Sequence, residues 1–212
     1  MSEPTNRPPE PTRRVPRAEV RRRLLTAAAA EFTARGYDDA RLESIAHAAG
    51  LTKGAIYSNF GGKRELFAAI LTERADLERE EVMGHVDGAE DLASATGLAA
   101  RSVARRIIED SERGKLGLEF AARATRDEDV RSVLAPMRRA QRAAAADSVA
   151  GVAERAGAPL AVEAELAGLI LHCLTNGLSM EHLADPDSVD ASAVEQAFNA
   201  VLTWLTGHAP GG

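Results

Sequence analysis

The clearest pattern of apolar and polar positions lies between residues 42 and 60, where two short apolar segments meet at Gly50. Before this glycine the apolar positions recur at i, i+3, i+4 and i+7, the spacing of one helix face. They are Leu42, Ile45, Ala46 and Ala49. After it, Ile56 and Phe60 are four residues apart and face the same small core. Gly50 tolerates positive φ, and Thr52 can cap the next helix with its hydroxyl. The pattern predicts two helices joined by a short turn.

The outward face of the second helix is formed by small and polar residues. At 100° per residue, Gly54, Ala55 and Ser58 lie opposite the buried pair, with Tyr57 and Asn59 at the flanks. Such a face can approach base edges in the major groove closely, and a cation at Lys53 would lie near phosphates. The spacing alone also suits a structural helical hairpin, which is common in all-helical proteins.

Amphipathic segments flank this motif on both sides. Residues 17–35 carry an apolar residue every four positions, and Gly36 ends the segment. These apolar residues are Val20, Leu24, Ala28 and Phe32. Downstream, Lys63 begins a long helix with an apolar stripe that includes Leu66, Phe67 and Ile70. Three helices and the start of a fourth are therefore expected in the first third of the chain.

The remaining residues read as helices separated by glycine, proline and acidic residues. Helices are expected over residues 62–86, 89–110, 115–124, 127–156, 162–182 and 191–205. Pro136 lies inside one of them and is expected to kink or split it. No run of alternating β-branched residues is present, and no apolar stretch approaches the ~18 residues that span a membrane. The sequence predicts an all-α fold.

The amino-terminal quarter resembles the TetR family of bacterial transcriptional regulators. The matching residues, in the family's order and spacing, are Ala30, Phe32, Gly36, Tyr37, Ile45, Ala46, Ala49, Gly50, Leu51, Lys53, Gly54, Ile56, Tyr57, Phe60, Lys63, Leu66 and Phe67. The resemblance implies a three-helix helix-turn-helix DNA-binding domain followed by a larger helical domain for dimerisation and ligand binding. We expect an arm at residues 1–16, the DNA-binding domain at 17–62, the regulatory domain at 63–207 and a tail at 208–212.

The same resemblance implies which residues meet DNA. They are Arg41, Thr52, Lys53, Gly54, Ala55, Tyr57, Ser58, Asn59 and Lys63. Tyr57 and Lys63 match positions that meet the phosphate backbone, and a helix N-terminus at Lys63 adds partial positive charge. The chain departs from the family at Ala40 and Arg41, where a hydroxyl residue commonly caps the second helix. We therefore expect Asp39 to provide the cap and Arg41 the phosphate contact.

Charge divides the chain in the same place as the motif. Residues 1–64 contain 12 Lys and Arg against 7 Asp and Glu, whereas the remainder contains 14 against 25. A basic amino-terminal region on an acidic body favours and orients DNA binding. Residues 1–16 contain five prolines and few apolar residues, so they are expected to be disordered, either as a solvated tail or as an arm that follows the minor groove.

Cysteine content and the amino-terminal sequence bear on localisation. Cys173 is the single cysteine, which excludes an intrachain disulfide and predicts a buried, reduced thiol. The polar, proline-rich start lacks the apolar segment of a signal peptide. We expect a cytoplasmic protein.

The last two expected helices carry apolar stripes wider than a solvent-facing helix requires. By resemblance they form the dimer interface, with candidate residues Leu166, Ile170, Cys173, Leu174, Gly177, Val194, Phe198, Val201, Leu202 and Leu205. Gly168 and Gly177 would allow close helix crossings. The alternative is a purely internal core. A dimer would place two recognition helices about 34 Å apart on successive major-groove faces.

Residues for catalysis are not arranged in any familiar pattern. The five histidines do not pair at metal-binding spacing, no Ser or Cys lies in a nucleophile elbow, and no phosphate-binding loop is present. We expect no enzyme activity, no cofactor and no bound metal. Candidate ligand-binding residues are Phe120, Arg123, Met137, His172 and Asn176. For His172 and Asn176 the alternative is a satisfied polar pair at the dimer interface, and for Phe120 and Met137 it is ordinary core packing.

These observations together predict a dimeric, sequence-specific DNA-binding regulator, acting as a ligand-responsive repressor on a palindromic operator. Its partners would be double-stranded DNA, a second copy of the chain and a small-molecule inducer, with no membrane contact. The alternative is a helical DNA-binding or scaffold protein that binds no small molecule and reads little sequence.

Overall fold

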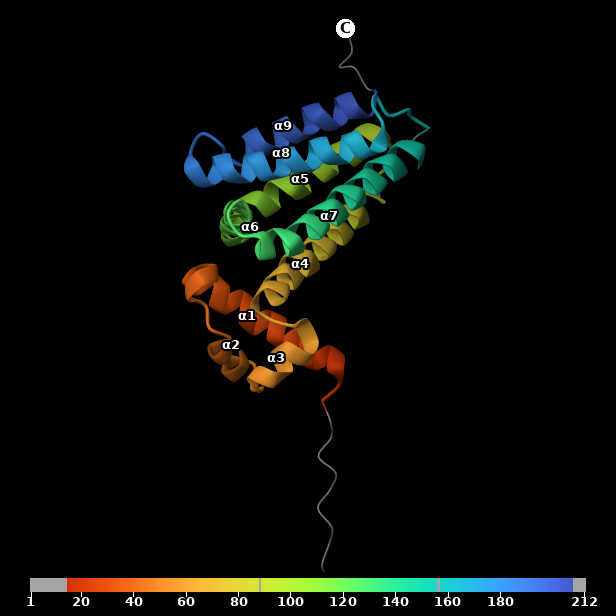
Figure 1. The fold of residues 1–212 in the computed structure, drawn as a ribbon. Coiled ribbons are helices and arrows are strands. Elements are labelled where there is room, and N and C mark those ends of the chain that lie inside the picture. Colours follow the sequence, from red (N-terminus) through yellow and green to blue (C-terminus); the bar gives the residue numbers. More distant parts are fainter. Residues whose placement is uncertain (1–14, 88, 156, 208–212) are drawn as a thin grey trace, which may run out of the picture.

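The computed structural model describes residues 15–87, 89–155 and 157–207 of the chain. Within these ranges it contains helices and no strands, which confirms the all-α prediction (Figure 1). The helices are α1 (Arg17–Asp39), α2 (Leu42–Ala48), α3 (Lys53–Phe60), α4 (Lys63–Val86), α5 (Leu92–Glu109), α6 (Ser111–Ala124), α7 (Glu128–Arg155), α8 (Ala164–Ala184) and α9 (Ala191–Leu205). The predicted arm up to residue 14 and the predicted tail at 208–212 lie outside the described residues.

We call α1–α3 the head and α4–α9 the body. The head lies at one end of the molecule, and α4 leads from it into the body (Figure 1). Gly36, with φ 70° and ψ 177°, interrupts the helical geometry of α1 where the sequence predicted its end. Gly50 has φ 66° in the turn that follows α2. Both glycines adopt conformations that other residues rarely tolerate, so they fix how the head helices meet.

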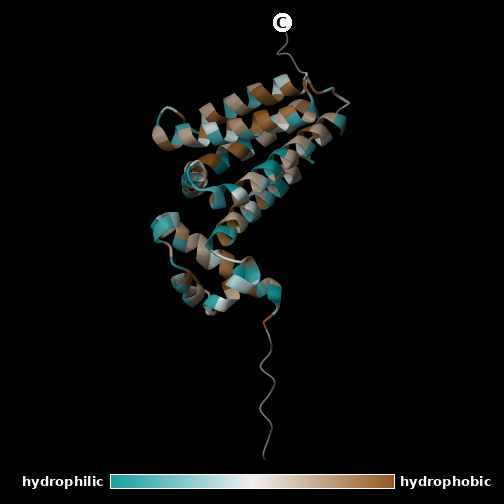
Figure 2. Cartoon of the chain, in the orientation of Figure 1, coloured by the Kyte–Doolittle hydropathy of each residue, from teal (hydrophilic) through white to brown (hydrophobic). Residues whose placement is uncertain are grey.

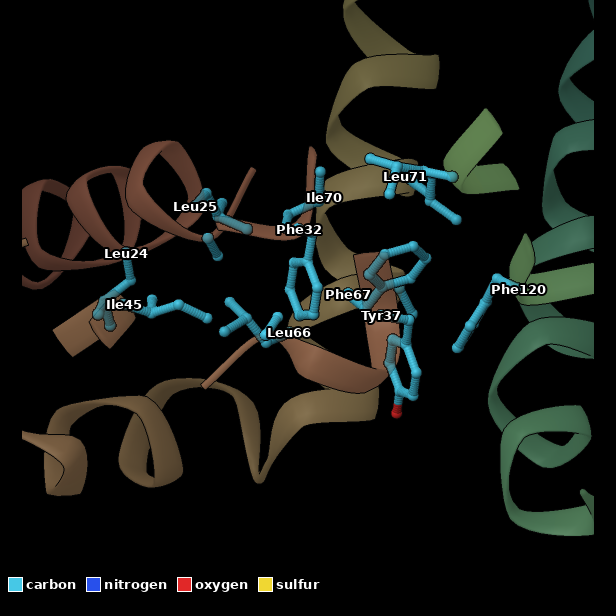
Figure 3. Close-up of a cluster of buried hydrophobic side chains, with 14 of the residues drawn as sticks. Leu24, Leu25, Phe32, Tyr37, Ile45, Leu66, Phe67, Ile70, Leu71 and Phe120 are labelled. Atoms are coloured by element: carbon cyan, nitrogen blue, oxygen red, sulfur yellow. The ribbon is translucent and has the colours of Figure 1, made fainter. Parts of the chain in front are cut away.

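The largest hydrophobic core continues from the head into the body. Phe32 and Tyr37 of α1 and Phe67 of α4 surround one another, with Phe32 and Phe67 ring centroids 4.8 Å apart. Phe120 of α6 closes the group, with its ring centroid 4.6 Å from that of Phe67. Figure 3 shows Phe120 reaching from the body toward Tyr37 and Phe67. Because edge-on and offset aromatic pairs add to the burial of apolar area, this cluster joins the two parts firmly.

In the body, α8 packs mainly on α7 and α9 mainly on α5. A Cβ atom at Gly168 would lie 2.4 Å from the carbonyl oxygen of Arg142, so the predicted close crossing occurs between α8 and α7 of one chain. A Cβ at Gly177 would meet nothing within 4 Å. The predicted split at Pro136 is wrong, because α7 runs unbroken through it. Pro136 and Ser132 are both exposed, so the turn in which the proline cannot donate a hydrogen bond lies on the solvent side of α7.

Several predicted dimer-interface residues instead belong to the chain's own core. Val194, Phe198 and Leu202 are buried against Ala100, Ala104 and Ile107 of α5, and Leu205 is fully buried beside Val149 and Ala167. Ile170, Leu174 and Val201 are partly buried against these clusters. The apolar stripe of α9 thus packs mainly on α5, and the internal-core alternative describes the four buried residues of α9. For the three partly buried residues a place in the dimer interface stays a prediction.

Apolar residues nevertheless remain on the outside of α8. Leu166, Leu169, Cys173 and Met180 are exposed there and recur at the spacing of one helix side, and we call them the outer α8 face. Cys173 was expected to be buried, and its exposure shows that the wide stripe of α8 extends beyond its contact with α7. Hydrophobic residues recur along α8 and α9 at the edge of the molecule farthest from the head (Figure 2). Among the helices of the described residues, none is both long and apolar enough to cross a bilayer.

Candidate nucleic-acid interface

The exposed side of α3 is formed by the residues that the sequence assigned to it, with one exception. Thr52, Lys53, Gly54, Tyr57 and Ser58 are exposed. Ile56 is fully buried and Phe60 partly buried in the head core. Ala55, predicted to face outward, is half-buried and packs against that core. Its position one residue before Ile56 turns it toward the side of the helix, so the accessible surface is narrower than predicted.

The predicted side-chain caps are absent. Thr52 is the N-cap residue of α3 with extended φ and ψ, but its hydroxyl makes no capping hydrogen bond. The first turn is closed instead by the backbone, because Ala55 N–H donates to the Thr52 carbonyl at 2.9 Å. The N-cap of α2 is Arg41, also without a side-chain bond, and Asp39 lies two residues earlier, as the last residue of α1. The hydroxyl of Thr52 therefore remains available at the surface.

Lys53 is paired with a carboxylate on the neighbouring helix. Its Nζ lies 2.6 Å from Oε1 of Glu43, and both side chains are exposed. The hydrogen bond to Glu43 raises the pKa of Lys53, and the same bond lowers the pKa of Glu43. Nζ also lies 6.0 Å from the centre of the Tyr57 ring. An exposed ion pair of this kind is weak, so a phosphate can displace Glu43 from Lys53.

Two polar side chains at the end of α3 bond to its backbone. Ser58 Oγ donates to the Ala55 carbonyl at 3.1 Å, and Asn59 Nδ2 donates to the same oxygen at 2.8 Å. The oxygens of both side chains keep acceptor capacity, which suits donor groups on base edges. The Tyr57 side chain is 51% exposed and points away from the core. The surface thus offers one cation, one large aromatic side chain and a few small polar groups.

Lys63 and Arg41 occupy different settings at the edge of the motif. Lys63 Nζ donates to the Asp38 carbonyl at 2.9 Å and lies 5.0 Å from the centre of the Tyr37 ring. Partial burial lowers the pKa of Lys63. In the absence of DNA its ammonium group is therefore held against the turn after Gly36, and its contact with the phosphate backbone stays a prediction. Arg41 is exposed, as a phosphate contact requires.

Contacts between the end of α1 and α6, which we call the joint, connect the head to the body. The sequence did not predict them. Tyr37 N–H donates to Oε1 of Glu119 on α6 at 2.8 Å. A Cβ at Gly36 would lie 3.3 Å from that carboxylate oxygen. Arg123, also on α6, forms an ion pair with Asp38 and lies 5.1 Å from the Tyr37 ring centre. Burial raises the pKa of Tyr37 to about 12, so its hydroxyl stays neutral. In the sequence, Gly36 indicated a turn at this position, but no pattern indicated that the turn would contact residues more than 80 positions away.

A cavity of about 340 Å³ lies in the body, lined by residues from α4 to α9. Met137, His172 and Asn176 line it, as predicted for ligand-binding residues. Phe120 and Arg123 do not line it, because Phe120 is buried in the aromatic cluster and Arg123 contacts the head. Arg138 also lines the cavity and was missed. In the part of the chain that the structure describes, no group of three or more His, Cys, Asp and Glu could hold a metal ion.

Within the cavity wall, His172 and Asn176 are satisfied by one chain alone. Arg138 Nη1 donates to Asn176 Oδ1 at 2.7 Å and lies 3.0 Å from His172 Nε2. Burial, and then the charge of Arg138, lowers the pKa of His172 to about 4. His172 is therefore neutral near pH 7, and its Nε2 accepts the bond from Arg138.

Two family profiles match this chain. The profile of "bacterial regulatory proteins, tetR family" matches residues 24–70, which covers most of the head and the start of α4. The profile of "BetI-type transcriptional repressor, C-terminal" matches residues 99–206, about half of the chain. The two matches cover the motif and most of the helical body, and residues 71–98 lie between them.

Individual relatives show higher identity over short stretches than over most of the chain. SrpR, a transcriptional regulator of Pseudomonas putida, is 46% identical over 56 residues, which is 26% of this chain and 26% of SrpR. YdgC of Bacillus subtilis is 33% identical over 103 residues, or 47% of this chain and 53% of YdgC. These matches thus span from about a quarter to about half of the relatives' lengths. TtgR of Pseudomonas putida is 26% identical over 81% of this chain and 84% of its own.

Solved structures share the fold over nearly the whole chain. A TetR-family transcriptional regulator from Rhodococcus sp. superimposes with a TM-score of 0.72 at 21% identity, covering 89% of this chain and 99% of its own. FadR from Bacillus subtilis, solved with stearoyl-CoA, has a TM-score of 0.64 at 15% identity, covering 89% and 98%.

Proposed function

The chain belongs to the TetR family of bacterial transcriptional regulators, and we propose that it represses transcription by binding a palindromic operator as a homodimer until a small molecule enters its body. The observation that carries the proposal is the exposed side of α3, where small side chains and Lys53 face outward from a basic head. Small residues let the helix approach base edges, and the cation meets phosphate. Operator binding and release would take place in the cytoplasm, and the proposed function includes no catalytic step.

Repression is favoured over activation by the match of the body. The profile over residues 99–206 is that of a repressor, and BepR of Brucella suis, 42% identical over 66 residues, is also named a repressor. FasR of Mycolicibacterium smegmatis, named an activator, is 43% identical over 63 residues. Relatives matched over short stretches thus include a repressor and an activator, so the argument for repression rests on the profile that matches the body.

Operator binding is tested by comparing a palindromic site from the DNA flanking the gene with random DNA at several salt concentrations. We expect a specificity ratio of roughly 10³ or more for the operator, with both affinities falling as salt rises. A ratio near one would overturn the proposal and favour a DNA-binding protein that reads little sequence.

Dimerisation is supported by the outer α8 face. Leu166, Leu169 and Met180 are each more than 40% exposed, and Trp204 of α9 is 53% exposed. Contiguous apolar residues on a surface commonly mark a protein contact. Leu169→Glu should convert a dimer to monomer in sedimentation velocity, because it buries a charge in the interface. The matched control is Leu77→Glu on α4, 60% exposed and outside this face, which should stay dimeric.

Ligand control is supported by the way two helices connect the cavity to the head. Leu71 and Thr72 of α4 line the cavity, and the same helix supplies Phe67 to the aromatic cluster. Gly114, Gly117 and Leu118 of α6 line it too, just before the residues that hold the turn after Gly36. A ligand that shifts either helix would change the spacing of two recognition helices. A coupling of ~1–3 kcal/mol would weaken operator binding roughly 5–150-fold.

A further inference from the structure

The cavity contains a guanidinium group whose hydrogen-bonding edge is half used. Both bonds that Arg138 makes, to Asn176 Oδ1 and His172 Nε2, come from Nη1. The edge formed by Nε and Nη2 has no bond to any residue that the structure describes. This edge presents two parallel N–H groups in the geometry that a carboxylate accepts in bidentate fashion.

The positive charge of Arg138 is also uncompensated. Arg138 forms no ion pair with the described residues, and its two partners are a neutral amide and a neutral imidazole. Burial lowers the pKa of Arg138, and the charge of Arg142 lowers it further. Two acidic residues, Asp76 and Asp110, line the same cavity, but two other cations, Arg79 and Arg106, line it with them. The lining therefore contains one more cationic side chain than acidic side chains, and we assign this excess positive charge to Arg138.

The rest of the wall around this cation is largely apolar. Met83, Val103, Ile107, Leu118, Met137 and Leu171 all line the cavity. A ligand with an apolar portion would bury its surface against them, as effectors in such pockets generally do. A cationic ligand would be repelled by Arg138, and a neutral one would leave the charge of this partly buried guanidinium without an anion.

We propose that the cavity takes an amphipathic monoanion, with its carboxylate on the Nε–Nη2 edge of Arg138 and its apolar tail along the α4–α6 side. The proposal rests on the function proposed above, in which this cavity is the effector site. Arg138 sets the class of ligand, and His172 and Asn176 hold the guanidinium in place. The carboxylate supplies the negative charge that the protein itself does not.

The test compares three probes with the same ten-carbon tail, decanoate, decanol and decylamine, by calorimetry and thermal shift on the full chain at pH 7.5. We expect decanoate to bind at least tenfold more tightly than decanol, and decylamine to bind most weakly. Equal or tighter binding of decanol, or no binding of decanoate, would overturn the proposal.

Variants on α7 show whether Arg138 is responsible. Arg138→Gln should remove the preference for decanoate, whereas Arg142→Gln, one turn away and outside the cavity lining, should keep it. Equal loss in both variants would mean a general field effect and would contradict a specific site. Arg138→Lys keeps the charge without the planar edge, so it should retain a reduced preference. It also provides a readout if Arg138→Gln does not fold.

Operator release separates this inference from the proposed function. If decanoate binds at Arg138 and leaves operator affinity unchanged, the anion site stands and ligand control of DNA binding fails. If a neutral or cationic molecule releases the operator and decanoate does not, the regulator stands and the anion site fails.

Discussion

The head and the body of this molecule present their key cations in opposite ways. Lys53 stands in solvent on the head and already has a carboxylate partner, Glu43, at 2.6 Å. Arg138 lines a cavity in the body, and its partners among the described residues are neutral. The exposed charge is balanced, and the sheltered charge is not.

This difference reflects the two kinds of anion that each region is proposed to meet. Duplex DNA carries a dense row of charges that can displace a weak surface ion pair, so a resident carboxylate moderates binding without preventing it. A single small anion has one charge, and a resident carboxylate in the cavity would exclude it. The comparison teaches that a cation without a carboxylate partner indicates an anion-binding site when it lies in a cavity. On an exposed surface, the presence or absence of such a partner does not indicate whether DNA binds.

The largest effect is expected at the contact between α1 and α6, which connects the head to the body. Gly36→Ala should lower the free energy of unfolding by about 2 kcal/mol, because the φ of 70° with ψ of 177° is nearly exclusive to glycine and the new Cβ would crowd Glu119. Denaturant unfolding measures it. Gly84→Ala, at an exposed helical site with open space, should instead stabilise by about 0.5–1 kcal/mol. Similar effects from both variants would argue against a strained joint.

Reversing the charge of the head cation should affect DNA binding alone. Lys53→Glu should reduce operator affinity about tenfold or more and lower the salt dependence by about one phosphate contact, as fluorescence anisotropy would show. Decanoate binding should not change. Lys115→Glu, an exposed lysine of the body that is likewise paired with a glutamate, serves as the control and should leave DNA affinity intact.

Removing the carboxylate of Glu43, which competes with phosphate for Lys53, should strengthen operator binding. Glu43→Gln frees Lys53 and takes a negative charge off the DNA-facing surface, so operator affinity should rise roughly two- to fivefold at low salt. Glu112→Gln, which breaks the matching pair with Lys115 on α6, should have no such effect. A fall in affinity for Glu43→Gln would show that Glu43 positions Lys53 for contact.

Acid should weaken the body through His172, and this effect is expected to be the smallest. The pKa of His172 is lowered from 6.5 to about 4 in the folded chain, so the unfolded chain takes up a proton first and stability falls as pH drops from 6.5 to 4. His172→Gln should reduce the loss of Tm across this range by about 2 °C, a modest value because the ring is partly exposed. His47→Gln, at an exposed position on α2, is the matched control for replacing a histidine, and its Tm at pH 7.5 should equal that of the parent chain.

The sequence predicted the helices and the outward side of α3 closely. Local spacing determines them, since glycines at 36 and 50 and the apolar positions around Ile56 admit few arrangements. It failed where a residue's partner lies far along the chain. Phe198 carries the periodicity of an interface helix, but periodicity does not say whether α5 or a second chain covers it.

The candidate site shows the same limit. Thr52 has the right residue type and position for a cap, yet the backbone closes the turn without its hydroxyl. Arg138 gave no signal, because an arginine on a polar helix usually faces solvent. Only the fold shows that α8 places two neutral acceptors against it and leaves its other edge open.

The aromatic cluster has a consequence for dividing or recombining this protein. A fragment that ended at residue 62 would keep Phe32 and Tyr37 but lose Leu66, Phe67 and Phe120, which cover them. Such a fragment would expose a large apolar surface and should aggregate. A chimera that joins this head to another body must therefore include the first two turns of α4. Its new body must also place an aromatic side chain at the position that Phe120 occupies.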